Sequence, residues 1–128
     1  MASILVIEDD DFFKSYLEMI LTGEGHKVRL CSDGRAGIDS ARANPPDVIL
    51  CDMSMPRMTG FVVIRELKRL PELKQVPIVA LSAHDTSADL DEAFEAGATD
   101  YVTKPVSVDD LIASVNKALN GDLPAPGT

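Results

Sequence analysis

Five short apolar segments alternate with five amphipathic segments along this chain, and the alternation restricts the fold more than any other feature. The apolar segments have the length of β-strands and cover residues 4–7, 28–31, 47–51, 76–81 and 100–103. Apolar residues recur at helical spacing from Phe12 to Leu21 and predict a first helix that ends at Gly23 or Gly25. Further helices are expected over residues 34–43, 61–70, 87–96 and 108–120. The chain is therefore expected to consist of five consecutive strand–helix units.

The expected strands are almost continuously apolar, which is typical of a parallel sheet covered by helices on both faces. Right-handed crossovers in a doubly wound sheet favour the strand order 2-1-3-4-5, with the second strand at one edge. We therefore predict an α/β fold with a five-stranded parallel sheet. The helical stripes predict these residues as inward-facing: Ala36, Ile38, Ala41, Ile64, Leu67, Leu70, Leu90, Ala93, Phe94, Leu111, Ile112, Val115 and Leu119.

The length of 128 residues fits one domain, which we expect over residues 1–121. Residues 122–128 are rich in Pro and Gly and are expected to form a flexible tail or a linker to a further domain.

Charge and cysteine usage exclude several classes of function. A net charge of −9 argues against direct binding of nucleic acid by this domain, because phosphate contacts dominate such binding.

No apolar run approaches the ~20 residues that cross a bilayer, and the first residues resemble no signal peptide. Cys31 and Cys51 show no C-x-x-C spacing and are expected to be small buried residues. We therefore expect a cytoplasmic protein that does not act at a membrane.

Four of the five expected strands run directly into polar residues of different chemical kinds. Glu8-Asp9 follow the first strand, Asp52 the third, Ser82 the fourth and Lys104 the fifth. In the predicted strand order these four strands are neighbours, and ligands bind at the carboxyl edge of such sheets. We therefore expect these side chains to form one site.

The chemistry of these groups favours a divalent cation and a phosphoryl group. Two carboxylates about 4 Å apart repel by roughly 4 kcal/mol at an effective dielectric constant of 20, so gathering Glu8, Asp9 and Asp52 calls for a cation. Carboxylate oxygens without His or Cys suit Mg²⁺ or Mn²⁺ rather than zinc. One acid can then act as a nucleophile for phosphoryl transfer, while Lys104 supplies positive charge and Ser82 a hydroxyl. Each residue alone has an ordinary explanation as a helix cap or turn residue; the four together do not.

These residues resemble the receiver domain of two-component response regulators, from residue 3 to about residue 120. Four stretches carry the resemblance, residues 4–10, 52–60, 78–83 and 97–105, which read ILVIEDD, DMSMPRMTG, IVALSA and GATDYVTKP. The resemblance implies a CheY-like, flavodoxin-like (βα)5 fold. It also implies that the domain is no conventional turnover enzyme but a bacterial signalling switch.

The resemblance assigns the phosphoacceptor and the metal ligands. Asp52 would take a phosphoryl group from a phosphohistidine on a sensor histidine kinase or a histidine phosphotransfer protein. Glu8, Asp9 and Asp52 would hold Mg²⁺, together with the backbone carbonyl of Ser54. Lys104 would contact the phosphoryl group, and the bond from Lys104 to Pro105 is expected to be cis.

The resemblance also assigns switch and lifetime residues. Ser82 corresponds to the hydroxyl residue that moves toward the phosphoryl group, and Tyr101 to the aromatic residue that swings inward behind it. Ser54 and His84 occupy positions that control water access, and we hypothesise that His84→Ala changes the phosphoryl lifetime without abolishing phosphorylation. The chain departs from the family mildly, with Glu8 where Asp is common, Ser82 where Thr is common, and Thr59 where Asp is frequent. Thr59 is expected to alter the capping of the loop more than the chemistry.

In the family the fourth helix, fifth strand and fifth helix form the surface that signals to a downstream partner. From Pro77 onward this sequence has two cations, Lys104 and Lys117, against nine acidic residues. Dimers formed through this surface pair cations with acids, so we expect a monomer, or binding of this surface to another protein. The alternative function is an interaction module of the same fold that takes no phosphate; the intact site residues disfavour it.

Overall fold

The computed structural model describes residues 2–83 and 86–121. The strands are β1 (Ser3–Ile7), β2 (Lys27–Cys31), β3 (Val48–Asp52), β4 (Ile78–Ser82) and β5 (Asp100–Thr103). The helices are α1 (Asp11–Gly23), α2 (Gly34–Ala43), α3 (Gly60–Arg69), α4 (Ser87–Ala96) and α5 (Val108–Asn120). The expected alternation of strands and helices is therefore confirmed.

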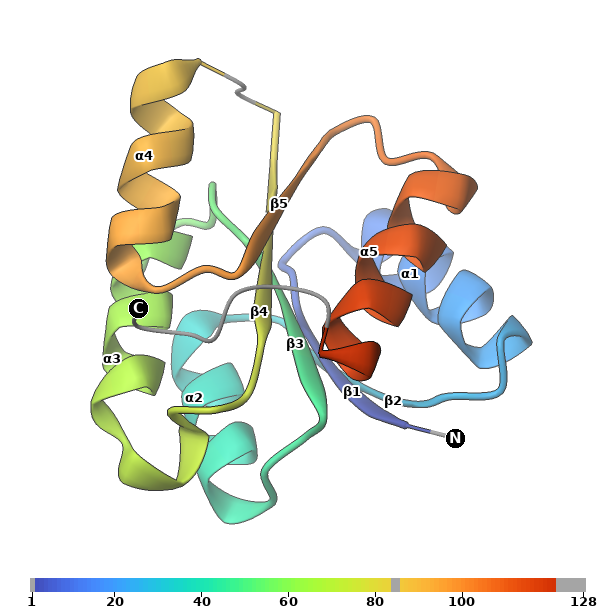
Figure 1. The fold of residues 1–128 in the computed structure, drawn as a ribbon, viewed down its shortest axis with the longest axis horizontal. Coiled ribbons are helices and arrows are strands. Elements are labelled where there is room, and N and C mark those ends of the chain that lie inside the picture. The colour runs from blue at the N-terminus through green and yellow to red at the C-terminus, as the bar shows by residue number, and fades with distance from the viewer. Residues whose placement is uncertain (1, 84–85, 122–128) are drawn as a thin grey trace.

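The five strands form one parallel sheet in the order β2-β1-β3-β4-β5, as predicted. Helices α1 and α5 cover one face of the sheet, and α2, α3 and α4 cover the other (Figure 1). This order places the ends of β1, β3, β4 and β5 side by side and leaves β2 at the edge.

A hydrophobic core lies on each face of the sheet because successive side chains of a strand point to opposite faces. On β1, Leu5 and Ile7 belong to the core beneath α2, α3 and α4, whereas Ile4 and Val6 belong to the core beneath α1 and α5. The side chains of β3 and β4 are buried along their whole length, as are those of β1 from Ile4 to Ile7. The acidic residues at the ends of β1 and β3 therefore follow fully buried segments.

Side-chain caps fix the start of four helices. Asp10, Asp33, Thr86 and Ser107 each accept a hydrogen bond from the backbone N–H three residues later. Thr59, which precedes α3, makes no such bond within the described part of the chain.

The structure differs from the predictions in several local details. A short 3₁₀ helix, η1 (Pro71–Leu73), lies between α3 and β4 and was not expected. The strand β4 begins two residues later than predicted, and Asp52 is the last residue of β3 rather than the first residue after it. The predicted tail, residues 122–128, lies outside the described residues.

Two side chains predicted to face inward are exposed. Phe94 is 46% exposed, because the buried stripe of α4 runs through Ala93 and Ala96, and Phe94 lies about 100° around the helix from Ala93. Ala36 is exposed, because α2 turns Gly37 and Ile38 toward the sheet instead. Helical spacing predicts the stripe but does not decide which neighbouring residue lies at its centre.

Cys51 is buried as predicted, whereas Cys31 at the sheet edge is only half-buried. Among the described residues, no helix combines the length and apolar character that crossing a membrane requires.

Candidate active site

The backbone of the sheet brings the acidic residues together. The register of β1 and β3 pairs Ile7 with Cys51, so Glu8 and Asp52 follow at neighbouring positions. The N–H of Glu8 donates to the carbonyl of Cys31 at 3.0 Å, which extends the parallel ladder with β2 by one residue. Both carboxylates are thus held by strand backbone rather than by loops.

Three carboxylates form a tight cluster at this edge. Glu8, Asp9 and Asp52 each offer a carboxylate oxygen, and these oxygens all lie within 4.8 Å of one another. Glu8 is 1% exposed and Asp52 is 2% exposed, whereas Asp9 is exposed. The cluster therefore has a buried base and one side that is open to solvent.

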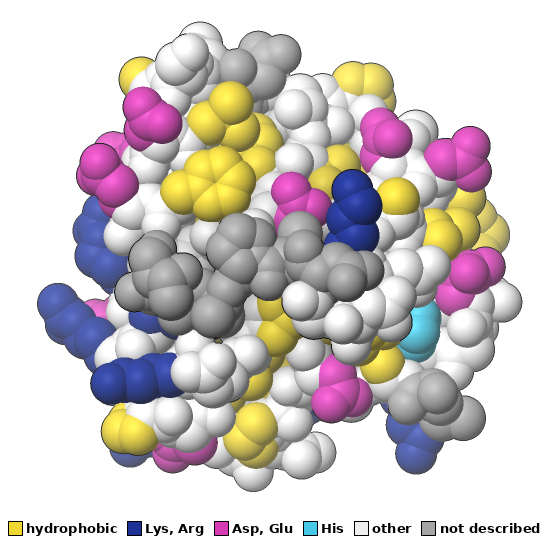
Figure 2. Space-filling view, in the orientation of Figure 1, with side chains coloured by type: hydrophobic (Ala, Val, Ile, Leu, Met, Phe, Trp, Pro, Cys, Tyr) yellow, Lys and Arg dark blue, Asp and Glu magenta, His cyan; other side chains and the backbone are white. Residues whose placement is uncertain are grey.

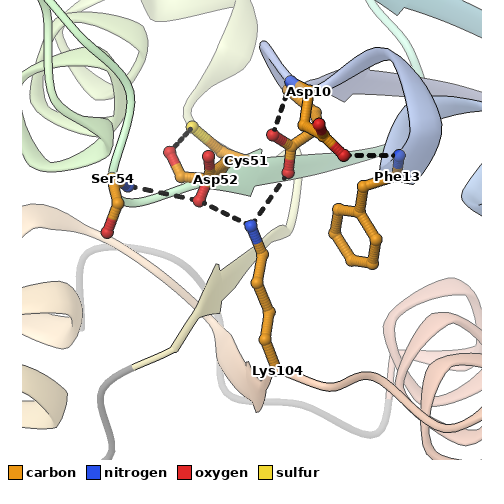
Figure 3. A network of polar contacts seen from close by, with 7 residues as sticks. Asp10, Phe13, Cys51, Asp52, Ser54 and Lys104 are labelled. Carbon is orange, nitrogen blue, oxygen red and sulfur yellow. Dashed lines mark hydrogen bonds and ion pairs between the residues drawn. The ribbon is translucent and has the colours of Figure 1, made fainter.

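Lys104 lies against the two buried carboxylates. Its Nζ is 3.1 Å from Glu8 Oε1 and 3.1 Å from Asp52 Oδ1 (Figure 3). The backbone N–H of Lys104 donates to the carbonyl of Ser82 at 2.7 Å, so the ladder between β4 and β5 positions this side chain. The bond between Lys104 and Pro105 is cis, as expected.

The ionisation of Glu8 depends on its burial and on its neighbours Asp52, Asp10 and Lys104. Burial is the main cause that raises the pKa of Glu8, and the charge of Asp52 also raises it. The hydrogen bonds from the Asp10 N–H and from Lys104 oppose both effects, and the resulting pKa is about 7. For Lys104, burial lowers the pKa, but the hydrogen bond to Glu8 and the charges of both carboxylates outweigh this, so the net shift is upward. Lys104 therefore remains a cation while Glu8 is poised to lose its proton near neutral pH.

The donor set fits Mg²⁺. Hard carboxylate oxygens surround the position, one of the three acids faces solvent, and Lys104 brings a single positive charge to three carboxylates. The nearest thiol, that of Cys51, is no candidate ligand, because burial raises its pKa and keeps it protonated while Sγ contacts the Asp52 carbonyl at 3.6 Å.

The other predicted site residues differ in how close they lie to this cluster. The N–H of Ser54 donates to Asp52 Oδ1 at 3.2 Å, while its side chain is exposed. Ser82 is buried as the last residue of β4, next to Leu81, which pairs with Asp52. Tyr101 is half-buried against the core beneath α2, α3 and α4. His84 lies outside the described residues.

Three contacts of the site were not predicted. The carboxylate of Asp10 caps α1 by accepting from the N–H of Phe13 at 2.8 Å, and its own N–H donates to Glu8 Oε2 at 3.0 Å. The ring of Phe13 lies beneath the ammonium of Lys104, with Nζ 4.6 Å from the ring centroid. The cap could have been found from the position of Asp10 before an apolar helix, but no pattern in the sequence predicts the ring contact.

Comparisons with known proteins identify the family of this chain. Residues 4–116 match the response regulator receiver domain family. The transcriptional regulatory protein AfsQ1 of Streptomyces coelicolor is 39% identical over 93% of this chain, which spans 52% of that protein. The protein PilH of Pseudomonas aeruginosa is 34% identical over 94% of this chain, which spans all of PilH.

Solved structures give the same result. The chemotaxis protein CheY4 of Vibrio cholerae superposes with a TM-score of 0.89 at 28% identity, covering 93% of this chain and 99% of that one. The receiver domain of the sensor histidine kinase PA1611 of Pseudomonas aeruginosa superposes with a TM-score of 0.87 at 29% identity, over 93% of this chain and 98% of that one. That structure has a magnesium ion coordinated in its active site cleft. The chain described above belongs to the response regulator receiver domain family of two-component systems.

Proposed function

We propose that Asp52 accepts a phosphoryl group from a phosphohistidine of a sensor histidine kinase or a histidine phosphotransfer protein. The observation that carries the proposal is the ammonium of Lys104, 3.1 Å from both Glu8 and Asp52, at the edge of a cluster of three carboxylates. A cation fixed beside a buried carboxylate is what transfer of a negatively charged group to that carboxylate requires.

Each residue of the site has a separate role in the transfer of the phosphoryl group. A carboxylate oxygen of Asp52 forms the new P–O bond as the P–N bond of the donor breaks, and the imidazole leaves with the bonding electrons and takes up a proton. Lys104 neutralises charge on the phosphoryl oxygens, and the hydroxyl of Ser82 binds one of them. The backbone N–H of Ser54 holds the Asp52 carboxylate in its orientation. The domain modifies itself and is no conventional turnover enzyme.

Glu8, Asp9, Asp52 and the carbonyl of Ser54 are the residues that would hold Mg²⁺, with Mn²⁺ as a substitute. The bound ion supplies charge neutralisation that Lys104 alone does not provide. Asp9 supports this assignment, because it belongs to the cluster and is its exposed member.

Ser82 and Tyr101 are proposed as the switch. Ser82 lies on β4 and Tyr101 lies on the adjacent strand β5. A movement of Ser82 toward a phosphoryl group would therefore be transmitted to Tyr101 through the paired backbone of these two strands. Ser54 and His84 are proposed to set the lifetime of the phosphorylated state by controlling the approach of water.

The surface formed by α4, β5 and α5 is proposed to bind a downstream protein, with the domain itself a monomer. Figure 2 looks onto this surface and shows hydrophobic side chains exposed beside α4 and β5, with acidic side chains around them. Phe94 is among the large exposed hydrophobic residues, and the sequence offers Lys117 as the cation of α5. Such a surface favours a partner with basic groups and disfavours DNA.

Acetyl phosphate with Mg²⁺, followed by intact mass measurement, tests the proposal. We expect wild type to gain one phosphoryl group and Asp52→Asn to gain none. Asp11→Asn is the matched control, since Asp11 is an exposed acid of the same segment that pairs with Lys14 and should leave the gain unchanged. A wild-type protein that gains nothing would support the alternative, a receiver-fold interaction module that takes no phosphate.

A further inference from the structure

Four residues around the site form a closed circuit of contacts. Glu8 Oε2 accepts from the N–H of Asp10 at 3.0 Å, and Asp10 Oδ2 accepts from the N–H of Phe13 at 2.8 Å. The ring of Phe13 faces the ammonium of Lys104, which returns to Glu8 Oε1 at 3.1 Å (Figure 3). Phe13 is the one apolar member of this circuit and has no part in the chemistry proposed above.

The contact between Phe13 and Lys104 has the geometry of a cation–π interaction. Nζ of Lys104 lies 4.6 Å from the ring centroid, inside the distance of about 6 Å at which the face of an aromatic ring attracts a cation. The Lys104 side chain is 24% exposed, so water competes only in part for the ammonium. The ring therefore contributes to the position of the charge.

Phe13 is itself held from two sides. Its backbone is fixed by the Asp10 cap at the first turn of α1. Its ring stacks on that of Tyr16, with centroids 6.0 Å apart and planes 21° apart. The hydroxyl of Tyr16 donates to the carbonyl of Val106 at 2.9 Å, two residues after Lys104. The aromatic pair thus connects α1 to the segment that carries Lys104.

The carboxylates and the ring differ in what happens to them during phosphoryl transfer. Asp52 loses its negative charge at the oxygen that forms the new bond, so its attraction for Lys104 changes. The quadrupole of the Phe13 ring does not change, and its attraction persists before, during and after the transfer. A contact that is independent of the reaction can keep the ammonium in place throughout it.

We infer that Phe13 is a positioning residue for phosphoryl transfer to Asp52, acting through a cation–π contact that holds the Lys104 ammonium at the site. This inference rests on the proposed function. Phe13 does not touch the reacting atoms, and its effect depends on the electrons of its ring rather than on its volume alone.

The inference is tested by replacing Phe13 with residues that keep the aromatic ring, remove it, or reduce the negative charge on its face. Phe13→Leu should slow phosphorylation by acetyl phosphate roughly two- to tenfold, and Phe13→Tyr should restore the rate to near that of wild type. Incorporation of mono-, di- and trifluorophenylalanine at this position withdraws charge from the ring face with little change in shape. We expect the rate to fall in steps along that series.

A second measurement does not depend on phosphorylation. With Lys104 labelled at Cε, its NMR signal should carry a ring-current shift in wild type and in Phe13→Tyr that is lost in Phe13→Leu. The fluorinated proteins should keep the fold, because the shape of the ring changes little, and they remain informative if Phe13→Leu is unstable.

Two results would overturn the inference while leaving the proposed function intact. One is a rate that is flat across the fluorinated series, and the other is a Lys104 signal that is the same in wild type and Phe13→Leu. Failure of wild type itself to take up a phosphoryl group would instead overturn the proposed function, and this inference with it.

Discussion

A β-carbon at Gly60 would collide with the carbonyl oxygen of Asp52. It would also lie 2.6 Å from Cα of Met53, and both obstacles are backbone that cannot rotate away. The N–H of Gly60 donates to the Met53 carbonyl at 3.3 Å, so the start of α3 is closed onto the end of β3. The absence of a side chain at this position is what lets the helix approach the site.

Gly60→Ala is therefore expected to lower the free energy of unfolding by about 1–3 kcal/mol, because the added methyl group forces α3 away from the end of β3. It should also weaken Mg²⁺ binding, since Asp52 moves with this backbone. Urea unfolding and calorimetric titration measure the two effects. Gly23→Ala is the control: nothing lies within 4 Å of its β-carbon, so its stability should change by less than about 1 kcal/mol.

The raised pKa of Glu8 predicts a pH dependence of stability in metal-free buffer. Its pKa rises from 4.5 to about 7 on folding, so the native state binds this proton more tightly than the unfolded chain does. The stabilisation is fully present below the unfolded value and is lost as the pH rises through about 7, with a maximum of roughly 3 kcal/mol.

Glu8→Gln isolates this contribution, because glutamine has no proton to lose. Between about pH 5 and about pH 8, the stability of the variant relative to wild type should rise by the amount that Glu8 loses. Chemical unfolding at several pH values in the presence of a chelator provides the measurement. Parallel pH profiles for the two proteins would contradict the assignment.

The positions of the charged site residues could be predicted from the sequence because parallel strands bring their carboxyl ends to one edge. Glu8 and Lys104 follow β1 and β5, Asp52 ends β3, and the order of these strands is dictated by right-handed crossovers. Their proximity therefore needs no knowledge of side-chain packing. The almost continuously apolar strands likewise predicted that helices cover both faces of the sheet.

Packing at the level of single side chains could not be predicted in this way. Phe94 and Ala36 belong to apolar stripes but are exposed, because the stripe is wider than the surface that each helix buries. The contact of Phe13 with Lys104 joins two distant segments through the rotamers of both side chains. Such a contact depends on the angle at which α1 crosses the sheet, which local patterns do not determine.

Asp9 is predicted to contribute to Mg²⁺ affinity without contributing to the fold. Its carboxylate belongs to the cluster, yet the residue is exposed. At a Mg²⁺ concentration a hundred times the dissociation constant, wild type should gain about 2.7 kcal/mol of stability, and Asp9→Asn should gain much less at the same concentration. Thermal unfolding with and without Mg²⁺ measures this gain.

Asp11→Asn controls for the loss of one negative charge near the site. Asp11 is 95% exposed at its side chain and pairs with Lys14 at 3.1 Å, outside the carboxylate cluster. It should gain as much stability from Mg²⁺ as wild type. Equal gains in Asp9→Asn and Asp11→Asn would show that Asp9 acts only through the overall charge.

Thr99 lies at the end of the sheet opposite the site, and its hydroxyl is predicted to contribute to the stability of the fold. Oγ1 accepts from the N–H of Ile78 at 2.6 Å and donates to the Ile78 carbonyl at 3.0 Å, with both residues buried. Thr99→Val keeps the shape but leaves the N–H of Ile78 without this acceptor, so unfolding should become easier by about 1–3 kcal/mol. Thr99→Ser keeps the hydroxyl and should lose clearly less in urea unfolding. A valine variant as stable as wild type would show that the hydrogen bonds of the Thr99 hydroxyl do not contribute to stability.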